Sequence, residues 1–287
     1  ENIRSVGDIL SAAQRCHQML TQLRDEAPAL DALAQNLTLL PDLALAIGRS
    51  FDERGDVAQS ASGELGALRH RVADLHEQLQ SMVQSLATQP EYSEKLQEEY
   101  YTIREDRYVL PVRSGQKNHV PGIVHGWSGS GATVYIEPQP VVDANNRLLL
   151  AQSDVDREIR RILKKLSAQV GQHAQEIEAS LECLVTLDLA WACGLLSKEL
   201  NASAPEMNKE PGFHLKQLRH PLLVLAGNRV VANDITLTAP ARVLVITGPN
   251  TGGKTVALKA VGLATLMGLS GLHIPADVGS CIPRSPA

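Results

Sequence analysis

The sequence is short of aromatic residues and carries no excess of positive charge. It has two Phe, two Trp and five Tyr in 287 residues. Leu, Ala, Gln and Glu are abundant instead, a composition typical of long helices packed through aliphatic side chains rather than of a β-sandwich. Because the net charge is −5, a polyanionic partner would have to meet a local basic surface.

Paired cysteines and long uncharged apolar runs are also missing. The four cysteines lie far apart without a C-x-x-C pair, which indicates reduced thiols in a cytosolic protein. No segment approaches 18 uncharged apolar residues, and the first residues show no signal-peptide pattern. We therefore expect neither secretion nor a membrane span. Since the chain begins without Met in a helical-looking segment, we expect it to be part of a longer protein.

Apolar residues at three- and four-residue steps predict helices throughout residues 1–100. The first helix is expected to end or kink at Pro28, and a second to run from Leu30 to Ile47. A third has apolar residues from Leu65 to Leu86 at a mean step of about 3.5 and continues toward Pro90.

The pattern changes to that of strands after Tyr101 and returns to that of helices after residue 142. β-forming residues occur in short runs, and the SGSG stretch at 128–131 predicts a turn between two strands. Helical spacing then continues over residues 143–199. A single helix of that length would measure on the order of 85 Å. A polar linker, NASAPEMNKEPG, follows it.

A phosphate-binding loop is the most specific motif. Gly248, Gly253, Lys254 and Thr255 fit G-x-x-x-x-G-K-[ST], between the apolar stretch VLVIT, predicted to be a strand, and a predicted helix. Glycines allow successive N–H groups to converge on phosphate oxygens, and a helix N-terminus adds partial positive charge. Lys254 would bridge the outer phosphates, and the Thr255 hydroxyl would complete an Mg²⁺ shell.

Four stretches resemble the MutS ATPases in order and spacing. They are LVITGPNTGGKTVALKAVG around the loop, LRHPLL, VVANDITL, and RYVLPVRSGQKNHVPGIVHGWSGSGATVYIEPQPVVDANN. The last is similar to the recombination-suppressing MutS paralogue of bacteria and chloroplasts, a branch without the mismatch-reading and connector domains. The resemblance is close over roughly residues 100–280 and looser over residues 1–100.

The resemblance implies a mainly α fold with a small β insertion and long lever helices, plus the start of an α/β P-loop NTPase domain. In this family a small clamp lies at the far end of the levers, and two chains pair through their ATPase domains. The expected domains are a helical core and lever (1–100), a β clamp (101–142), a long returning lever helix (143–204) and an incomplete ATPase domain (205–287). The expected location is the cytoplasm, or the chloroplast stroma for a plant protein, and no membrane is implied.

The resemblance also implies that ATP and Mg²⁺ are cofactors of the complete protein, which would be an ATPase. Thr255 would be the metal contact. The implied nucleotide-binding residues are Gly248, Pro249, Asn250, Thr251, Gly252, Gly253, Lys254 and Thr255. Val231 and Asn233 resemble positions flanking the adenine. Arg219 and His220 could reach the nucleotide, although a structural role for them is favoured.

The sequence departs from the family pattern near its end. No acidic strand of the kind that organises Mg²⁺ follows the IPA stretch. We therefore expect the 287-residue chain alone to bind ATP weakly or not at all and to hydrolyse it negligibly. The nuclease module of family members would lie beyond Ala287, so no catalytic residue is assigned.

Basic side chains in the β insertion are candidates for nucleic-acid binding. They are Arg104, Arg107, Arg113 and Lys117. They suit phosphate contacts without base readout, with a solvated, ion-paired loop as an equally weighted alternative. Basic residues at 157–165 favour an exposed, ion-paired helix face. Trp127 is expected to pack in the β core rather than stack on a base, and Trp191 and Tyr108 are expected to be core or seam residues.

Three functions stay open. The first is an ATP-dependent protein that clamps branched or mismatched DNA and restrains recombination, with ATP binding driving lever and clamp movement. The second is an ATPase that binds stalled or collided ribosomes, through rRNA, and splits them. The third treats residues 1–210 as a passive helical scaffold, in which case Lys254→Ala would leave every activity intact.

Overall fold

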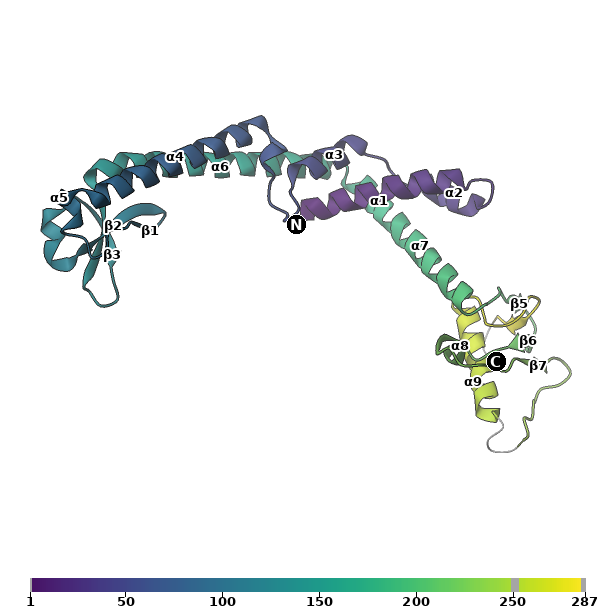
Figure 1. The fold of residues 1–287 in the computed structure, drawn as a ribbon. Helices are drawn as coiled ribbons and strands as arrows, with labels where there is room; N and C mark the ends of the chain where they lie inside the picture. The colour runs from purple at the N-terminus through teal and green to yellow at the C-terminus, as the bar shows by residue number, and fades with distance from the viewer. Residues whose placement is uncertain (1, 249–252, 285–287) are drawn as a thin grey trace. The chain divides into compact units, whose positions relative to one another are not determined.

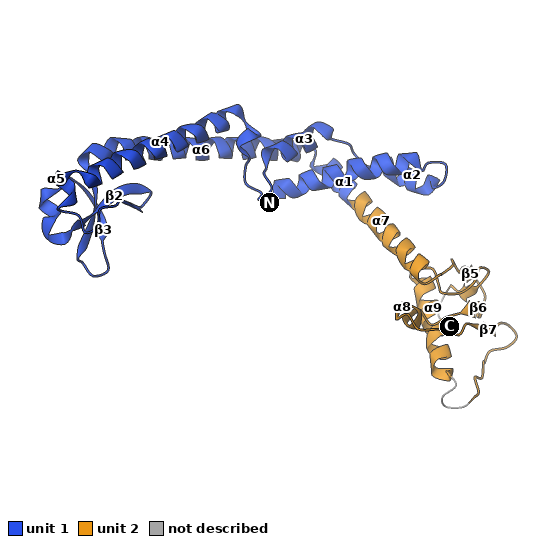
Figure 2. Ribbon diagram, in the orientation of Figure 1, with its two compact units in different colours: residues 1–181 blue, residues 182–287 orange. Residues whose placement is uncertain are grey.

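The structure is a computed structural model that describes residues 2–248 and 253–284. The chain divides into two compact units, residues 1–181 and 182–287, and Figures 1 and 2 show the elements of each. The helices up to the second unit are α1 (Asn2–Gln22), α2 (Pro28–Ala34), α3 (Pro41–Ser50), α4 (Gly63–Thr88), α5 (Pro90–Ser93), α6 (Gln139–Gln172) and α7 (Ala174–Glu199). The four expected domains stay a prediction.

Helices α4 and α6 pack against each other along their lengths in antiparallel directions (Figure 1). Near the β-sheet, Leu79 and Leu86 of α4 share a core with Leu148 of α6, and at the other end Leu65 packs with Ile162. The helix predicted around Leu65 is confirmed. At about 1.5 Å per residue, the 34 residues of α6 extend about 50 Å.

The second predicted helix, Leu30–Ile47, is wrong as a single element. The structure has α2 and α3 there, with a non-helical connection between them. Pro41 is the reason, because its ring disfavours the helical conformation at the preceding residue. Leu40 accordingly has φ −121° and ψ 67°, and α3 begins directly at Pro41.

The single long helix predicted over residues 143–199 is also wrong, because α6 ends at Gln172 and α7 starts at Ala174. His173 lies between them with φ −114° and ψ 20°. Gly171, a poor helix former, lies two residues before His173. The His173 Nδ1 lies 2.8 Å from a Glu176 carboxylate oxygen at the start of α7. Beyond the break, Ile177 packs among residues of α1 and α3, and Ser180 Oγ accepts a hydrogen bond from the Thr38 amide.

The predicted β insertion is confirmed as a four-stranded antiparallel sheet. Its order is β1-β2-β4-β3, and its strands are β1 (Thr102–Arg104), β2 (Arg107–Arg113), β3 (Gly122–Trp127) and β4 (Thr133–Pro138). The short helix η2 (Ser114–His119) connects β2 to β3. Leu110, Val112 and Val134 on one face pack against the ends of α4 and α6, which completes the core at this end. The turn predicted at residues 128–131 joins β3 to β4.

The second unit contains most of α7 and a smaller sheet. Its order is β5-β8-β6-β7, from β5 (Glu206–Asn208), β6 (Phe213–Leu218), β7 (Asn233–Leu237) and β8 (Cys281–Pro283), with α8 (Pro221–Leu225) and α9 (Lys254–Leu269). Helix α9 buries Ala260, Ala264 and Gly268, one on each successive turn. A Cβ atom at Gly268 would overlap the buried side chain of Ile282, so the helix approaches the sheet through its smallest residues.

The apolar stretch before the phosphate loop does not form the predicted strand. Residues 243–247 have no regular secondary structure, and Val243 and Val245 are largely exposed. An apolar strand of a parallel sheet is stabilised by neighbours on both sides and by packing on both faces. None of the described strands pairs with this stretch, so its intrinsic β propensity alone does not order it.

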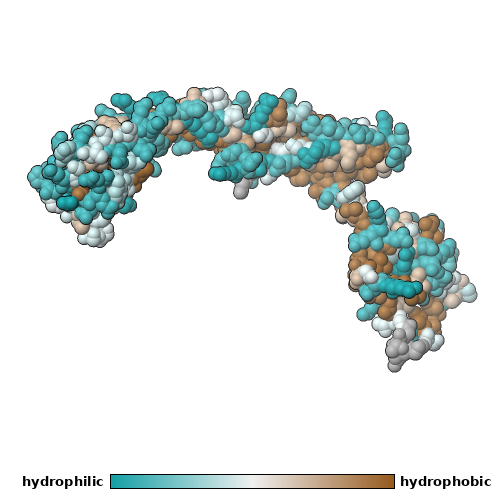
Figure 3. Space-filling view, viewed as in Figure 1, coloured by the Kyte–Doolittle hydropathy of each residue, from teal (hydrophilic) through white to brown (hydrophobic). Residues whose placement is uncertain are grey.

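Helix α7 exposes apolar side chains, which also departs from expectation. Trp191, predicted to be a core or seam residue, is 67% exposed, whereas Tyr108 is buried as predicted. Figure 3 shows hydrophobic surface on the second unit and around α1 and α2 of the first, while the visible face of α4 and α6 is mostly hydrophilic. By length and composition α7 is the one described helix that could cross a membrane. Glu182 and Asp188 lie within its apolar region.

A buried carboxylate links α6 to the start of α4. Glu158 is 4% exposed and accepts hydrogen bonds from Arg161 at 2.6 and 2.7 Å and from Ser62 Oγ at 2.7 Å. Ser62 is also the N-cap of α4, since its Oγ accepts from the Leu65 amide. The hydrogen bonds from Arg161 and then Ser62 lower the pKa of Glu158, against the opposing effect of burial.

Replacing Gly122 by Ala is predicted to destabilise the first sheet. A Cβ atom there would overlap the main-chain carbonyl of Glu137, which cannot move without breaking the β3–β4 pairing. We expect Gly122→Ala to lower the free energy of unfolding by about 2 kcal/mol or more in chemical denaturation. Gly129→Ala is the matched control, because a Cβ atom there meets nothing within 4 Å. Equal effects of the two changes would contradict this packing.

The lowered pKa of Glu158 predicts an acid-dependent loss of stability. A carboxyl group with a lower pKa in the folded state stabilises the fold above its unfolded pKa, and this contribution is lost as pH falls through the folded value. The difference in free energy of unfolding between the wild type and Glu158→Gln should therefore be largest near neutral pH and shrink below a pH of about 4. A difference that stays constant from pH 7 to pH 3 would show that the charge of Glu158 does not stabilise the fold.

Candidate nucleotide and nucleic-acid sites

The described part of the phosphate loop has backbone conformations suited to glycine. Gly248 has φ 151° and Gly253 has φ 79°, and Gly253 is the N-cap of α9. Lys254 Nζ donates a hydrogen bond of 2.6 Å to the carbonyl of Gly248, so the lysine connects the two ends of the loop. The predicted ligands between them, Pro249, Asn250, Thr251 and Gly252, lie outside the described residues.

The N-terminus of α9 is electrostatically favourable for an anion. This 16-residue helix has no acidic residue in its first turn, and Gly253 has no side chain with which to cap it. One short segment thus carries three kinds of group that attract an anion: the first amides of α9, the Lys254 ammonium group and the exposed Thr255 hydroxyl. These groups could hold the phosphates of a nucleotide, and the Thr255 hydroxyl could supply one oxygen ligand to Mg²⁺. Among the described residues, no cluster of three or more His, Cys, Asp or Glu could hold a metal ion by itself.

The other residues considered for the nucleotide have different surroundings. His220 is buried, and its carbonyl accepts hydrogen bonds from two amides at the start of α8. Arg219 donates a hydrogen bond of 3.3 Å to the carbonyl of Asn201. Both are thus held within the fold of the second unit. Val231 is largely exposed, and Asn233 lies at the start of β7.

The four basic residues predicted to bind nucleic acid divide into two groups. Arg113 is exposed at the end of β2. The Arg104 guanidinium lies 4.4 Å from the centre of the Tyr135 ring, and Lys117 Nζ lies 5.1 Å from the centre of the Trp127 ring. These three cations lie on or near the surface of the sheet. The fourth, Arg107, pairs with an internal carboxylate.

That carboxylate belongs to Glu137, which is 0% exposed and forms the centre of a polar network. One of its oxygens accepts from Arg107 Nη1 at 2.7 Å and Asn145 Nδ2 at 2.8 Å, and the other lies 2.7 Å from His125 Nε2. Asn145 on α6 also bonds both the amide and the carbonyl of Tyr108. The network joins β2, β3 and β4 to α6, so Arg107 is held as part of the sheet's support.

The sequence carries one signal of this network. Asn145 lies between Val141 and Leu148, in the apolar stripe of a predicted helix. A buried amide requires hydrogen-bond partners, and Glu137 lies eight residues earlier, at the end of the preceding strand. Trp127 was also misassigned, because it is 52% exposed and does not pack in the β core.

Two of the five basic residues at 157–165 on α6 are ion-paired, so the expected ion-paired helix face is present in part. Arg157 pairs with Asp154 at 3.0 Å, and Arg161 pairs with Glu158. Arg160 donates to the carbonyl of Asp156.

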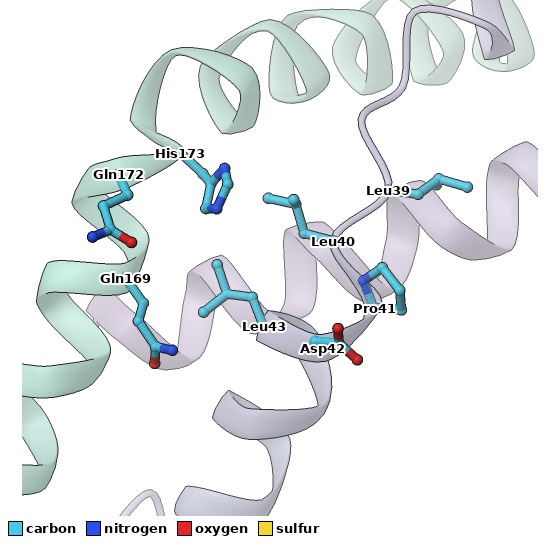
Figure 4. Close-up of a pocket in the computed structure, with 8 residues that line it drawn as sticks. All are labelled: Leu39, Leu40, Pro41, Asp42, Leu43, Gln169, Gln172 and His173. Carbon is cyan, nitrogen blue, oxygen red and sulfur yellow. The ribbon is translucent and has the colours of Figure 1, made fainter.

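A separate cavity of about 320 Å³ lies between α3 and the break after α6. Figure 4 shows its lining, in which Leu40 and Leu43 lie near Gln169 and His173. Since no Lys or Arg lines it, this pocket does not have the chemistry of a phosphate site.

Comparison with curated proteins gives extensive matches. The chain is 44% identical over 280 residues, 98% of its length, to a protein named endonuclease MutS2 from Pelotomaculum thermopropionicum. It is 40% identical over 278 residues, 96% of its length, to a putative endonuclease MutS2 from Bacillus subtilis. A Clostridioides difficile endonuclease MutS2 is 38% identical over 278 residues, also 96% of the chain. No family model matches the chain.

These observations define a mainly helical protein with a small β-sheet inserted between two long helices and a glycine-rich segment preceding α9. The relatives identify the family, because each of them matches nearly the whole chain. The chain belongs to the MutS family and is of the MutS2 type. It spans about a third of the length of the curated relatives it matches, 35% in each of these three comparisons.

Substitutions in the two groups of basic residues should differ in their effect on the free energy of unfolding. Arg107→Ala leaves the buried Glu137 carboxylate without its cation, so we expect the free energy of unfolding to fall by about 3 kcal/mol. Arg113→Ala removes an exposed cation from the same strand and should change it by less than about 0.5 kcal/mol. Chemical denaturation of both variants measures this, and equal losses would contradict the assignment of Arg107 as a supporting residue.

Proposed function

We propose that this chain is part of an ATP-dependent nucleic-acid-binding protein. In this proposal, a nucleotide binds at the start of α9, and the β1–β4 sheet grips a DNA backbone, with branched DNA as the preferred form. The observation that carries the proposal is the arrangement at α9, where Lys254 and the glycines at 248 and 253 meet at a helix start without acidic residues.

ATP binding is supported by the chemistry of that segment. When bound, ATP with Mg²⁺ would bring negative charge that backbone amides, the Lys254 ammonium group and the Thr255 hydroxyl can neutralise. Lys254 already reaches back to Gly248, so its side chain spans the loop that would surround the phosphates. A ligand would replace the carbonyl as the partner of Nζ.

DNA binding is supported by the cations around the β1–β4 sheet. Arg104, Arg113 and Lys117 remain available once Arg107 is assigned to the Glu137 network. Cations without an accompanying set of base-reading side chains favour contacts to phosphates, which give binding that is independent of sequence and sensitive to salt. The sheet is fixed to α4 and α6, so a force on it would be transmitted to those helices.

For the whole protein we propose ATP hydrolysis by a homodimer in the cytoplasm and restraint of recombination. The relatives are named endonucleases, and a nuclease activity of the whole protein is part of the proposal, although no residue of this chain is assigned to it. A cytoplasmic location fits the two carboxylates within the apolar region of α7, which would be costly inside a membrane.

Lys254 provides the test of this function. In a full-length protein carrying this sequence, Lys254→Ala should reduce ATP hydrolysis to the background rate and abolish binding of a fluorescent ATP analogue. Lys259→Ala, an exposed lysine farther along α9, should leave both unchanged and is the matched control. Unchanged turnover in Lys254→Ala would refute the nucleotide mechanism and favour the passive scaffold.

A further inference from the structure

Trp127 presents an exposed indole at the end of β3, an edge strand of the first sheet. Trp127 ends β3 and is 52% exposed, whereas its cross-strand partner Val134 is fully buried. Trp is normally among the most buried residues on average, because its large apolar surface is costly to hydrate. Among the described tryptophan and tyrosine residues of this sheet, Tyr108 shows the ordinary behaviour, being 5% exposed.

The surroundings of Trp127 leave access to its ring. The turn that follows consists of Ser128, Gly129, Ser130 and Gly131. Ser128 Oγ accepts a hydrogen bond from the Thr133 amide, and Gly131 has φ 70°, so the turn is held in a defined conformation. Cβ atoms built at Gly126, Gly129 and Gly131 would meet nothing within 4 Å. Small residues therefore flank the indole, and no bulky neighbour on this turn screens it.

A cation accompanies the indole. Lys117, on η2, places its Nζ 5.1 Å from the centre of the Trp127 ring. The ammonium group lies over one face of the indole. A cation–π contact at an exposed site is weak, so the ammonium group can move from that face to a phosphate with little loss and leave the ring open to a base. An aromatic face with a cation beside it matches the two parts of a nucleotide, the base and the phosphate.

The chemistry favours an unpaired nucleotide over a base pair. In a duplex the bases stack on one another, and only their edges are open to a protein in the grooves. The flat face of an indole can be used only by a base that has left the stack. Stacking tolerates every base, since all four present a π face, which agrees with a surface that does not read sequence.

We propose that Trp127 and Lys117 form a binding site for an unpaired nucleotide, with the base stacked on the indole and the adjoining phosphate next to the ammonium group. This inference rests on the proposed nucleic-acid binding and specifies its target as nucleic acid with exposed single-stranded segments, as at a branch point. Arg104, which lies over Tyr135, is assigned to general phosphate contacts and not to this site.

The two tryptophans of the chain make the test direct. Trp191 is also exposed but lies on α7, so Trp191→Phe leaves Trp127 as the only indole, and Trp127→Phe leaves Trp191. Each variant of the 287-residue chain is titrated with oligo(dT), with oligo(U) and with a blunt DNA duplex of equal length. Both single strands should quench the Trp127 emission, and neither should quench that of Trp191. The strand that reaches half-maximal quenching at the lower concentration identifies whether DNA or RNA is the preferred source of the nucleotide.

Affinities complete the test. Trp127→Ala should weaken single-strand binding about tenfold, Trp127→Phe by less because a ring remains, and duplex binding should change less than twofold. Lys117→Ala should weaken single-strand binding and reduce its salt dependence. Single-strand binding that is retained in Trp127→Ala without quenching in the Trp191→Phe variant overturns this inference and leaves the proposed function standing. If the wild-type chain binds neither single strands nor duplex, the proposed function fails and this inference fails with it.

Discussion

The arrangement of the first unit depends on the need to neutralise one carboxylate that has no access to water. Glu137 lies at the end of β4 and takes its partners from β2, β3 and α6. An unpaired buried carboxylate would cost several kcal/mol, so the sheet and the helix are stable only in the arrangement that brings these donors together. Asn145 adds geometric precision because it bonds both main-chain groups of Tyr108. The positions of Trp127, Lys117 and Arg113 relative to α6 follow from this constraint.

The α4–α6 pair carries a second neutralised carboxylate far from the first. Glu158 is held by Arg161 of its own helix and by Ser62, the cap of α4. Between the two carboxylates, the helices pack through aliphatic side chains. The hydrogen bond from Ser62 to the buried Glu158 carboxylate is directional and holds the start of α4 in one position against α6. The Glu137 network fixes α6 to the sheet at one end, and the hydrogen bond between Ser62 and Glu158 fixes α6 to the start of α4 at the other.

How much of this could be read from the sequence depended on whether local or distant residues decide each feature. The helix around Leu65, the strands on either side of the 128–131 turn and the α9 helix rest on periodicity and turn residues, and they were predicted. Pro41 and Gly171 are residues that often end helices. The two breaks near them were not predicted, because helical spacing of apolar residues continues on both sides. The conformation of residues 243–247 and the exposure of Trp127 and Trp191 depend on which segments pack against them. Sequence periodicity carries no information about that packing. The sequence marks Asn145 as a buried amide that needs partners, but it does not identify those partners, because the members of the Glu137 network come from four separate segments.

The central claim is that Glu137 and Asn145 make the sheet and the helices a single cooperative structure. Native-state hydrogen exchange tests it most directly, by comparing the amides of β2 and β4 with those of α4 and α6. The account predicts that these amides open together with one free energy, and that Asn145→Ala separates them, with the sheet exchanging at a lower free energy than the helices. Independent exchange of the sheet and the helices in the wild type, unchanged by Asn145→Ala, would contradict it.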